Sequence, residues 1–368
     1  MGVAQDKDRS DESFLRPAFS TNRQISAFVT LMILILLLPA LITLSGKVSR
    51  RDSYDLMSEE HGAYSFIASE IFDNKDDIDI LFIGSSIQWN AVDTSQVEQA
   101  LSDSLGRPAR VVSFGFNFNG IDVPYFMLRD TLARKRVRLV IFSIPRLPFN
   151  DGPNATAFKF LRYNEYNDAS ADLPFKYKAA SYAAGILRSP SDLITALRKN
   201  KIPDSKFAPA LGANKEKMGM GRDPSKFAEF SPQPPVVSPN ELIFSGDTAG
   251  NFQFTDDDLP TYQENYLREL ISLLKKENVP LSIINVPQYN ERSNTKVFER
   301  FNWTTKFGEN IPLIGIAPAQ LFQDLTPDEV ERLHCDPYHF NANGNAYFTH
   351  AVLPAIIQVY DRHANKTF

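Results

Sequence analysis

Short apolar runs bounded by turn residues organise most of the chain after residue 60. Runs of this length, rich in Val, Ile and Phe, are typical of buried strands in a parallel sheet. They occupy residues 78–83, 110–114, 138–144 and 280–286. Before each run, apolar residues recur at helical spacing, over residues 64–72, 92–105, 123–133 and 262–277. This alternation predicts an α/β fold, a three-layer α/β/α sandwich with a mainly parallel sheet.

One longer apolar segment precedes these runs. Residues 25–44 read ISAFVTLMILILLLPALITL, 20 residues without a charge. A helix of that length spans roughly the 30 Å hydrocarbon thickness of a bilayer. The segment predicts one transmembrane helix that is retained as an anchor, preceded by a cytoplasmic N-terminal tail over residues 1–24. A cleaved signal peptide and a buried core helix are the alternatives.

The remaining chain divides into two parts of one domain and an insertion. A polar linker is predicted over residues 45–60, and the α/β domain over residues 61–149 and 261–368. The intervening residues 150–260 are too many for one crossover and predict an insertion or subdomain. Its basic half should contain a helix over residues 176–199, and the Pro-rich residues 231–239 predict an extended linker. The insertion is interpreted as a solvated surface, a lid over a substrate or a docking surface for a membrane partner.

Composition excludes several classes of protein. The 368 residues carry 39 Lys and Arg against 44 Asp and Glu, a net charge of −5, which argues against a protein that coats nucleic acid. Cys335 is the only cysteine, so an intramolecular disulfide and a multi-thiolate zinc site are both excluded. Stability must therefore come from packing.

A first group of candidate chemical residues follows the first predicted strand. Gly84, Ser85 and Ser86 come directly after this strand and before a helical pattern that begins near Asp93. At the carboxyl end of a parallel strand, such a turn can expose a nucleophilic hydroxyl beside backbone N–H groups. The same tripeptide also occurs in ordinary turns and helix caps.

A second group precedes the final apolar helix, predicted over residues 346–359. Asp336 lies three residues before His339, in a loop with Pro337. This spacing lets a carboxylate hold one imidazole nitrogen while the other faces a nucleophile, as in a Ser-His-Asp triad. Two alternatives stay open. One is a metal site built from His334, Cys335, Asp336 and His339; the other is a turn aspartate beside a packed histidine.

Together the two segments resemble the SGNH (GDSL-type) hydrolase superfamily. There the nucleophile follows the first strand in a Gly-Asp-Ser block, and an Asp-x-x-His pair precedes the last helix. By this resemblance Ser86 is the nucleophile, Ser85 replaces the usual aspartate, Asp336 is the orienting acid and His339 is the base. The continuation of His339 into Asn341 and Gly344 also fits.

The resemblance also suggests how an oxyanion would be held. The backbone amides of Ser86 and Gly115 are the expected donors, with Gly115 in the second block. In the third block, the Asn-containing motif of the superfamily is replaced by Ser143-Ile144-Pro145-Arg146. The missing donor leaves several candidates for an oxyanion or substrate contact, namely Ser85, Asn117, Asn119, Asn150 and Arg146.

The Gly-Ser-Ser block, the missing asparagine and the predicted anchor are similar to the branch of the superfamily that O-acylates cell-envelope polysaccharides. Alginate O-acetyltransferase-like proteins and the D-alanyl-transfer protein of teichoic acids belong to this branch. The resemblance implies an extracytoplasmic domain on the cytoplasmic (inner) membrane, a polysaccharide acceptor, and an acyl donor delivered by a multi-spanning membrane acyltransferase. It implies no metal or cofactor. An esterase or deacetylase, and a non-catalytic scaffold that binds glycan or the acyltransferase, are the alternative functions.

Overall fold

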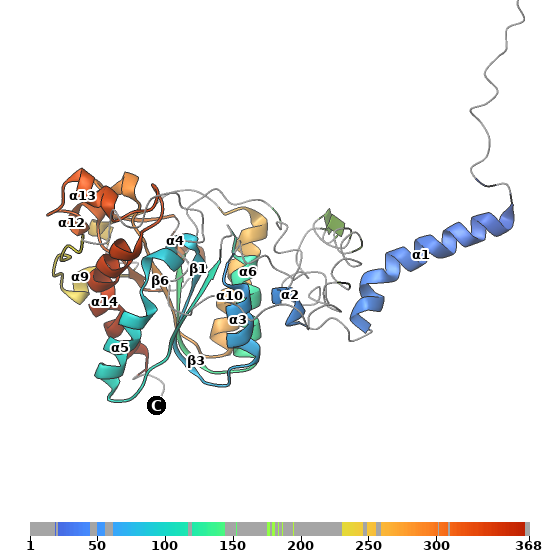
Figure 1. Ribbon diagram of the computed structural model, residues 1–368, viewed down its shortest axis with the longest axis horizontal. Helices are drawn as coiled ribbons and strands as arrows, with labels where there is room; N and C mark the ends of the chain where they lie inside the picture. The colour runs from blue at the N-terminus through green and yellow to red at the C-terminus, as the bar shows by residue number, and fades with distance from the viewer. Residues whose placement is uncertain are drawn as a thin grey trace, which may run out of the picture.

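The structure is a computed structural model of the chain (Figure 1). It describes residues 19, 21–44, 50–55, 62–116, 120–143, 230–245, 249–254, 259–300, 302–307 and 310–364, and a few isolated positions between 152 and 194.

A six-stranded sheet forms the centre of the described part of the chain, in the order β2-β1-β3-β6-β8-β4. Neighbouring strands run parallel except β4 and β8, which pair antiparallel. The strands are β1 Ile78–Ser85, β2 Val111–Phe116, β3 Val137–Ser143, β4 Ile243–Phe244, β6 Leu281–Ile284 and β8 Leu313–Ile314. The mixed α/β class with a mainly parallel sheet is thus confirmed.

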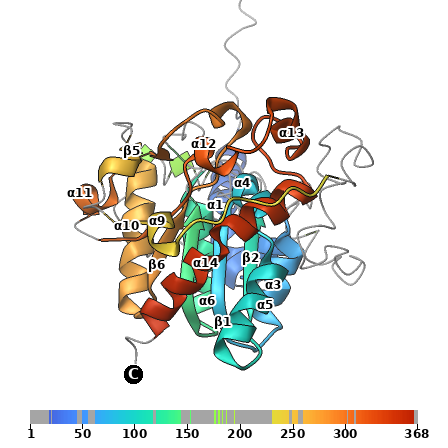
Figure 2. The ribbon, with the colours of Figure 1, turned by 90° about the vertical axis from the view of Figure 1, so that its left-hand side faces the viewer.

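Helices cover both faces of the sheet (Figures 1 and 2). One face carries α3 (Tyr64–Phe72), α6 (Asp122–Leu132) and α10 (Thr261–Lys276), and the other carries α5 (Thr94–Leu105) and α14 (Ala342–Ala364). Each face has its own apolar core, because alternate strand residues point to opposite sides. Leu81 and Ile83 of β1 pack with the first group of helices, and Ile80 and Phe82 pack with the second.

The predicted elements with long apolar patterns lie close to their predicted positions. Helix α3 has the predicted bounds, and α5, α6 and α10 differ from theirs by one or two residues. Elements of two to six residues are too short to show a period and were not predicted. They are α2 Asp52–Asp55, α4 Ser86–Ala91, α9 Pro239–Leu242, η8 Ala249–Asn251, β5 Phe252–Phe254, η9 Tyr289–Glu291, β7 Val297–Glu299, α11 Trp303–Phe307, α12 Pro318–Leu321 and α13 Pro327–Arg332, together with β4 and β8.

The predicted linker over residues 45–60 includes residues that pack into the domain. Tyr54 of α2 is fully buried, and its hydroxyl donates to Asp130 of α6 over 2.7 Å. The guanidinium of Arg50 pairs with the same carboxylate at 2.6 Å. Both contacts are largely removed from solvent, so residues 50–55, predicted as part of the linker, belong to the folded domain.

The predicted insertion also differs from the structure. Strand β4 lies within residues 150–260, yet it joins the edge of the central sheet, so the insertion is shorter at its carboxyl end. Residues 231–238 have no regular secondary structure, Val237 packs into the core, and Pro239, the last residue of the predicted linker, begins α9. The helix predicted over residues 176–199 lies outside the described residues, apart from isolated positions.

Helix α1 (Asn22–Leu44) covers the segment predicted to cross a membrane. Its large apolar side chains between Ile25 and Leu37 are exposed. Within the part of the chain that the structure describes, no helix has both the length and the apolarity that crossing a membrane requires. The transmembrane anchor and the membrane location therefore stay predictions.

Helix α5 offers a simple test of the local backbone. It ends at Gly106, whose φ of 63° lies in the left-handed region, and a Cβ there would have no atom within 4 Å. Gly106→Ala is expected to lower the free energy of unfolding by about 1 kcal/mol, because only the backbone conformation is penalised. Asn tolerates this conformation better, so Gly106→Asn should cost less. Urea unfolding measures both, and equal stability of Gly106→Ala and wild type would contradict the assigned conformation.

Candidate active site

Ser86 lies where the central strand β1 passes into the short helix α4. All eight residues of β1 are buried, and the strand ends between β2 and β3, with Gly84 opposite Gly115 on one side and Ser143 on the other. The carboxyl ends of parallel strands are where α/β proteins bind ligands. The structure thus places Ser86, which is 7% exposed, at the predicted location.

The structure brings the three predicted catalytic side chains together. The Ser86 hydroxyl lies 2.9 Å from Nε2 of His339, across 253 residues of sequence. Nδ1 of the same imidazole lies 2.8 Å from Oδ2 of Asp336. An ionised carboxylate only accepts hydrogen bonds, so the imidazole proton belongs on Nδ1, and Nε2 is left to accept from Ser86. This is the arrangement of a nucleophile, a base and an orienting acid.

The loop that carries Asp336 keeps its carboxylate ionised. Its Oδ1 accepts from the backbone amides of Tyr338 at 2.7 Å and His339 at 2.9 Å. Partial burial raises the pKa of Asp336, but the hydrogen bonds from the His339 ring and from the two amides outweigh it, so its pKa lies below the usual range. The loop thus favours the carboxylate form of Asp336, which only accepts hydrogen bonds.

Asn341 caps the start of α14, directly after this loop. Its side-chain oxygen accepts from the amides of Asn343 and Gly344, and its amide group donates to the Arg332 carbonyl over 2.6 Å. Free N–H groups at a helix start are normally satisfied in this way. The cap ties His339, two residues earlier, to the first turn of α14.

The first amides of α4 face no side-chain cap. Ser85 holds the capping position, but its hydroxyl makes no capping bond. It is buried and has no hydrogen-bond partner among the described residues. A capping serine would accept from the amide of Ile87 or Gln88, so here these two amides lack a side-chain cap. The Ser86 amide stays the predicted oxyanion donor at this helix start.

The Gly115 amide, the second predicted oxyanion donor, has a different orientation. The carbonyl of Gly115 accepts from the Ala63 amide over 3.2 Å, at the edge of β2 that faces away from β1. The amide and the carbonyl of one strand residue point to the same side. The Gly115 amide therefore faces Ala63 and not Ser86, which argues against its predicted role. Gly115 instead leaves room for Trp89, whose ring would lie 2.0 Å from a Cβ there. The predicted candidates outside the described residues are Asn117, Asn119, Arg146 and Asn150.

The residues of the alternative metal site point in different directions. His334 is buried, and its Nδ1 lies 2.8 Å from the Val330 carbonyl, with its ring against Phe340. The Cys335 thiol faces the carbonyl of Phe340 at 3.6 Å. Over the described ranges, no three His, Cys, Asp or Glu side chains gather as metal ligands would. Asp336 instead contacts His339, which contacts Ser86.

Sequence reasoning missed the residues that hold α4 against α14. Asn90 donates to the Ser86 carbonyl over 2.7 Å, Asn345 donates to the Asn90 carbonyl over 3.2 Å, and Thr349 donates to the Ala91 carbonyl over 3.2 Å. Asn345 and Thr349 lie four residues apart, on one face of α14. The sequence signal is weak, because α14 also contains other polar residues, such as His350 and Gln358.

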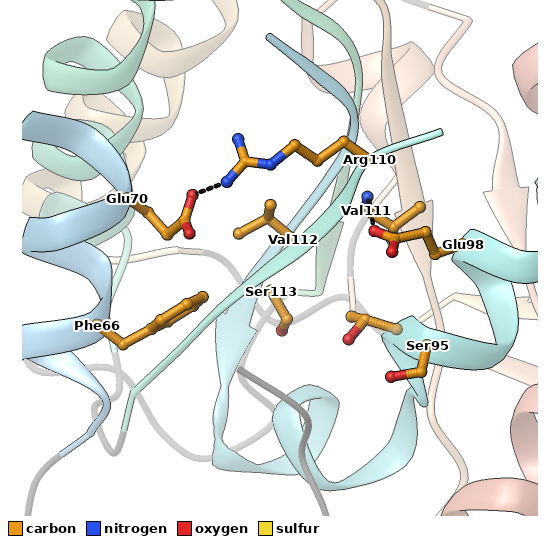
Figure 3. A pocket seen from close by; sticks show the side chains of 9 residues that line it. Phe66, Glu70, Ser95, Glu98, Arg110, Val111, Val112 and Ser113 are labelled. Atoms are coloured by element: carbon orange, nitrogen blue, oxygen red, sulfur yellow. Dashed lines mark hydrogen bonds and ion pairs between the residues drawn. The ribbon is translucent and has the colours of Figure 1, made fainter. Parts of the chain in front are cut away.

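A cavity of about 260 Å³ lies away from these residues, at the open edge of β2 (Figure 3). Glu70 of α3 and Glu98 of α5 lie on its two sides, and no residue of the triad lines it. Its charged groups are engaged: Arg110 pairs with Glu70, and Glu98 accepts from the Val111 amide over 2.8 Å. We assign this cavity no part in the site.

Comparisons of the chain with protein-family models and with curated proteins find no match. The case for the site therefore depends on its geometry and on the resemblance of its motifs.

Proposed function

We propose that the protein is a membrane-anchored serine acyltransferase that O-acylates, and specifically O-acetylates, a cell-envelope or exported polysaccharide. The observation that carries the proposal is the continuous contact from the Ser86 hydroxyl through His339 to Asp336, at 2.9 and 2.8 Å. A buried serine, an imidazole and an ionised carboxylate in this order are the machinery of acyl transfer. The motif resemblance supports the polysaccharide and the anchor.

The chemistry proceeds in two steps. His339 takes the hydroxyl proton of Ser86 onto Nε2 as the oxygen attacks the carbonyl carbon of an ester or thioester donor. The C–O or C–S bond of the donor then breaks, His339 returns the proton to the leaving group, and an acyl-Ser86 ester remains. In the second step Nε2 removes a proton from the acceptor hydroxyl, whose oxygen attacks the ester carbonyl. The bond between the acyl carbon and Ser86 Oγ breaks, and Nε2 returns the proton to Oγ, which regenerates Ser86.

The acceptor decides between the proposed function and its first alternative. A sugar hydroxyl gives an acylated polysaccharide, while water gives net hydrolysis, as in an esterase or deacetylase. The resemblance favours transfer, with the acyl donor handed over by a multi-spanning membrane acyltransferase. On the same grounds the domain would lie on the extracytoplasmic side of the inner membrane, held there by α1.

A fluorophosphonate probe tests the nucleophile. We expect it to label the wild-type protein covalently and to leave Ser86→Ala unlabelled, because phosphonylation needs the activated hydroxyl. Ser282→Ala is the matched control, since Ser282 is a buried serine in β6 whose hydroxyl has no hydrogen-bond partner within the described part of the chain. This control should label like wild type. An unlabelled wild type, or a labelled Ser86→Ala, would support the non-catalytic scaffold instead.

A second measurement separates transfer from hydrolysis. The wild-type protein is incubated with a small acetyl ester, with and without an oligosaccharide, and the acetyl group is followed into acetate and into sugar ester. Sugar acetylation that depends on Ser86 would support the transferase. Acetate release alone would support the esterase.

A further inference from the structure

We infer that Asn345 and Thr349 of α14 are positioning residues, which set the distance between the Ser86 hydroxyl and the His339 imidazole by fastening α4 to α14. The inference rests on the proposed function, since it concerns the reactivity of Ser86. Neither residue touches the reacting atoms in the structure, and both act through the backbone of α4.

The contacts lie at the carboxyl end of α4. This helix has only six residues, Ser86–Ala91, and the last carbonyls of a helix have no partner within it. Asn345 donates to the Asn90 carbonyl, and Thr349 donates to the Ala91 carbonyl. The Thr349 hydroxyl also accepts from the amide of Asp93 over 2.8 Å. One face of α14 thus satisfies the end of α4 and the start of α5.

These contacts are shielded from water. Asn90 is 2%, Asn345 is 5% and Thr349 is 0% exposed. A buried polar group that loses its partner costs about 1–3 kcal/mol, so the bonds constrain the position of α4 more than surface bonds would.

Each catalytic residue is linked to this junction. On the α4 side, Asn90 donates to the Ser86 carbonyl and so joins the nucleophile to the end of its helix. On the α14 side, the amide of Asn345 donates to the Asn341 carbonyl over 2.8 Å, and Asn341 lies two residues after His339. A shift of α4 along α14 would therefore change the distance from Ser86 to His339 directly.

Removing the hydroxyl of Thr349 is the first test. Thr349→Val keeps the shape of the side chain, while the Ala91 carbonyl and the Asp93 amide both lose their partner. We expect the rate of fluorophosphonate labelling of Ser86 to fall about 10- to 100-fold, because misplacement of reacting groups by about 1 Å costs that much. Thr349→Ser keeps the hydroxyl and should restore most of the rate.

The matched control is Thr131→Val. Thr131 is also 0% exposed, and its hydroxyl donates to the Met127 carbonyl within its own helix α6, away from the triad. Both valine variants lose a buried hydroxyl, so both should lose stability in urea, and Thr349→Val should lose more because two backbone groups lose their partner rather than one. Only Thr349→Val should lose labelling rate, measured in buffer without urea where every variant is folded.

Asn345→Leu provides an independent arm, because it removes the donor to Asn90 at similar side-chain volume. A fall in the labelling rate with an unchanged midpoint of the pH–rate profile supports positioning, since the base itself is untouched.

Labelling of both variants at the wild-type rate would overturn the inference while leaving the proposed function intact. An unlabelled wild type would instead overturn the proposed function. If Thr349→Val does not fold, Thr349→Ser and Thr349→Ala are compared instead. The ratio of their labelling rates then measures the effect of the hydroxyl.

Discussion

Asp336→Asn is expected to lower the rate of Ser86 acylation by about 10⁴-fold, the loss known for replacing the acid of such a triad by its amide. The reason is the way the loop orients the Asp336 carboxylate towards the His339 ring. The loss of activity requires no change in fold.

The two oxygens of Asp336 differ in their backbone partners. Oδ1 accepts from the backbone amides of Tyr338 and His339 and lies 3.0 Å from Nδ1 of the His339 ring, while Oδ2 is nearer to Nδ1, at 2.8 Å. In Asp336→Asn, an oxygen that stays with the two amides places the NH₂ group at the Oδ2 position, the nearer of the two to Nδ1. The imidazole then protonates on Nε2, and Nε2 can no longer accept the proton of Ser86.

Hydrolysis of a small acetyl ester and fluorophosphonate labelling both measure this loss. Asp336→Ala is the informative companion, because it removes the orienting acid without presenting a donor to Nδ1, and it should retain more activity than Asp336→Asn. Nitrogen NMR of His339 should show the Nδ1-protonated tautomer in wild type and the Nε2-protonated tautomer in Asp336→Asn. Activity of Asp336→Asn within tenfold of wild type would contradict the assigned role of Asp336.

The order of the main strands and helices and the location of the triad could be predicted from the sequence, for related physical reasons. The run at residues 78–83 is apolar enough to be buried on both faces, so it had to be a central strand. A hydroxyl that follows a central strand lies at the carboxyl edge, where the Asp336 loop also ends. Local spacing placed the acid beside the base, and topology brought the serine to them.

Features that depend on contacts between distant residues could not be predicted. Tyr54 lies in a polar stretch that reads as a linker, and only the pairing with Asp130 explains its burial. Gly115 matched an oxyanion motif by position, but the bond between its carbonyl and Ala63 turns its amide away. Strand β4 has two residues and no periodicity, and its place depends on β8. In each case the structure depends on a contact with a residue far away in the sequence, which the local pattern of polar and apolar residues does not show.

Asp122 is the source of the second large effect, on stability rather than on activity. Its side chain is 0% exposed at the start of α6, and the Tyr262 hydroxyl donates to it over 2.7 Å. Burial raises the pKa of Asp122 from 3.8 to about 6, although the hydrogen bonds from Tyr262 and from the amide of Val123 lower it. The folded protein therefore binds a proton there that the unfolded chain releases at lower pH.

The sign of the pH dependence follows from this difference. The protonated carboxyl favours the folded state, so its contribution is fully present below about pH 4 and is lost as the pH rises through about 6. A rise of about 2 pKa units corresponds to about 3 kcal/mol. Asp122→Asn keeps an acceptor for Tyr262 and has no charge to bury. At pH 7.5 we expect it to be more stable than wild type by up to about 3 kcal/mol, and at pH 4 by much less.

Urea unfolding at pH 4, 5, 6 and 7.5 measures the difference between the two proteins. Tyr262→Phe is the companion variant, because loss of the hydroxyl removes a bond that favours the carboxylate and should steepen the loss of stability above pH 6. If wild type and Asp122→Asn show the same pH dependence, then Asp122 is not buried as an ionisable group. Among the described residues no positive charge offsets this burial, because the partners of the Asp122 side chain are the Tyr262 hydroxyl and backbone amides, and this accounts for the large expected gain.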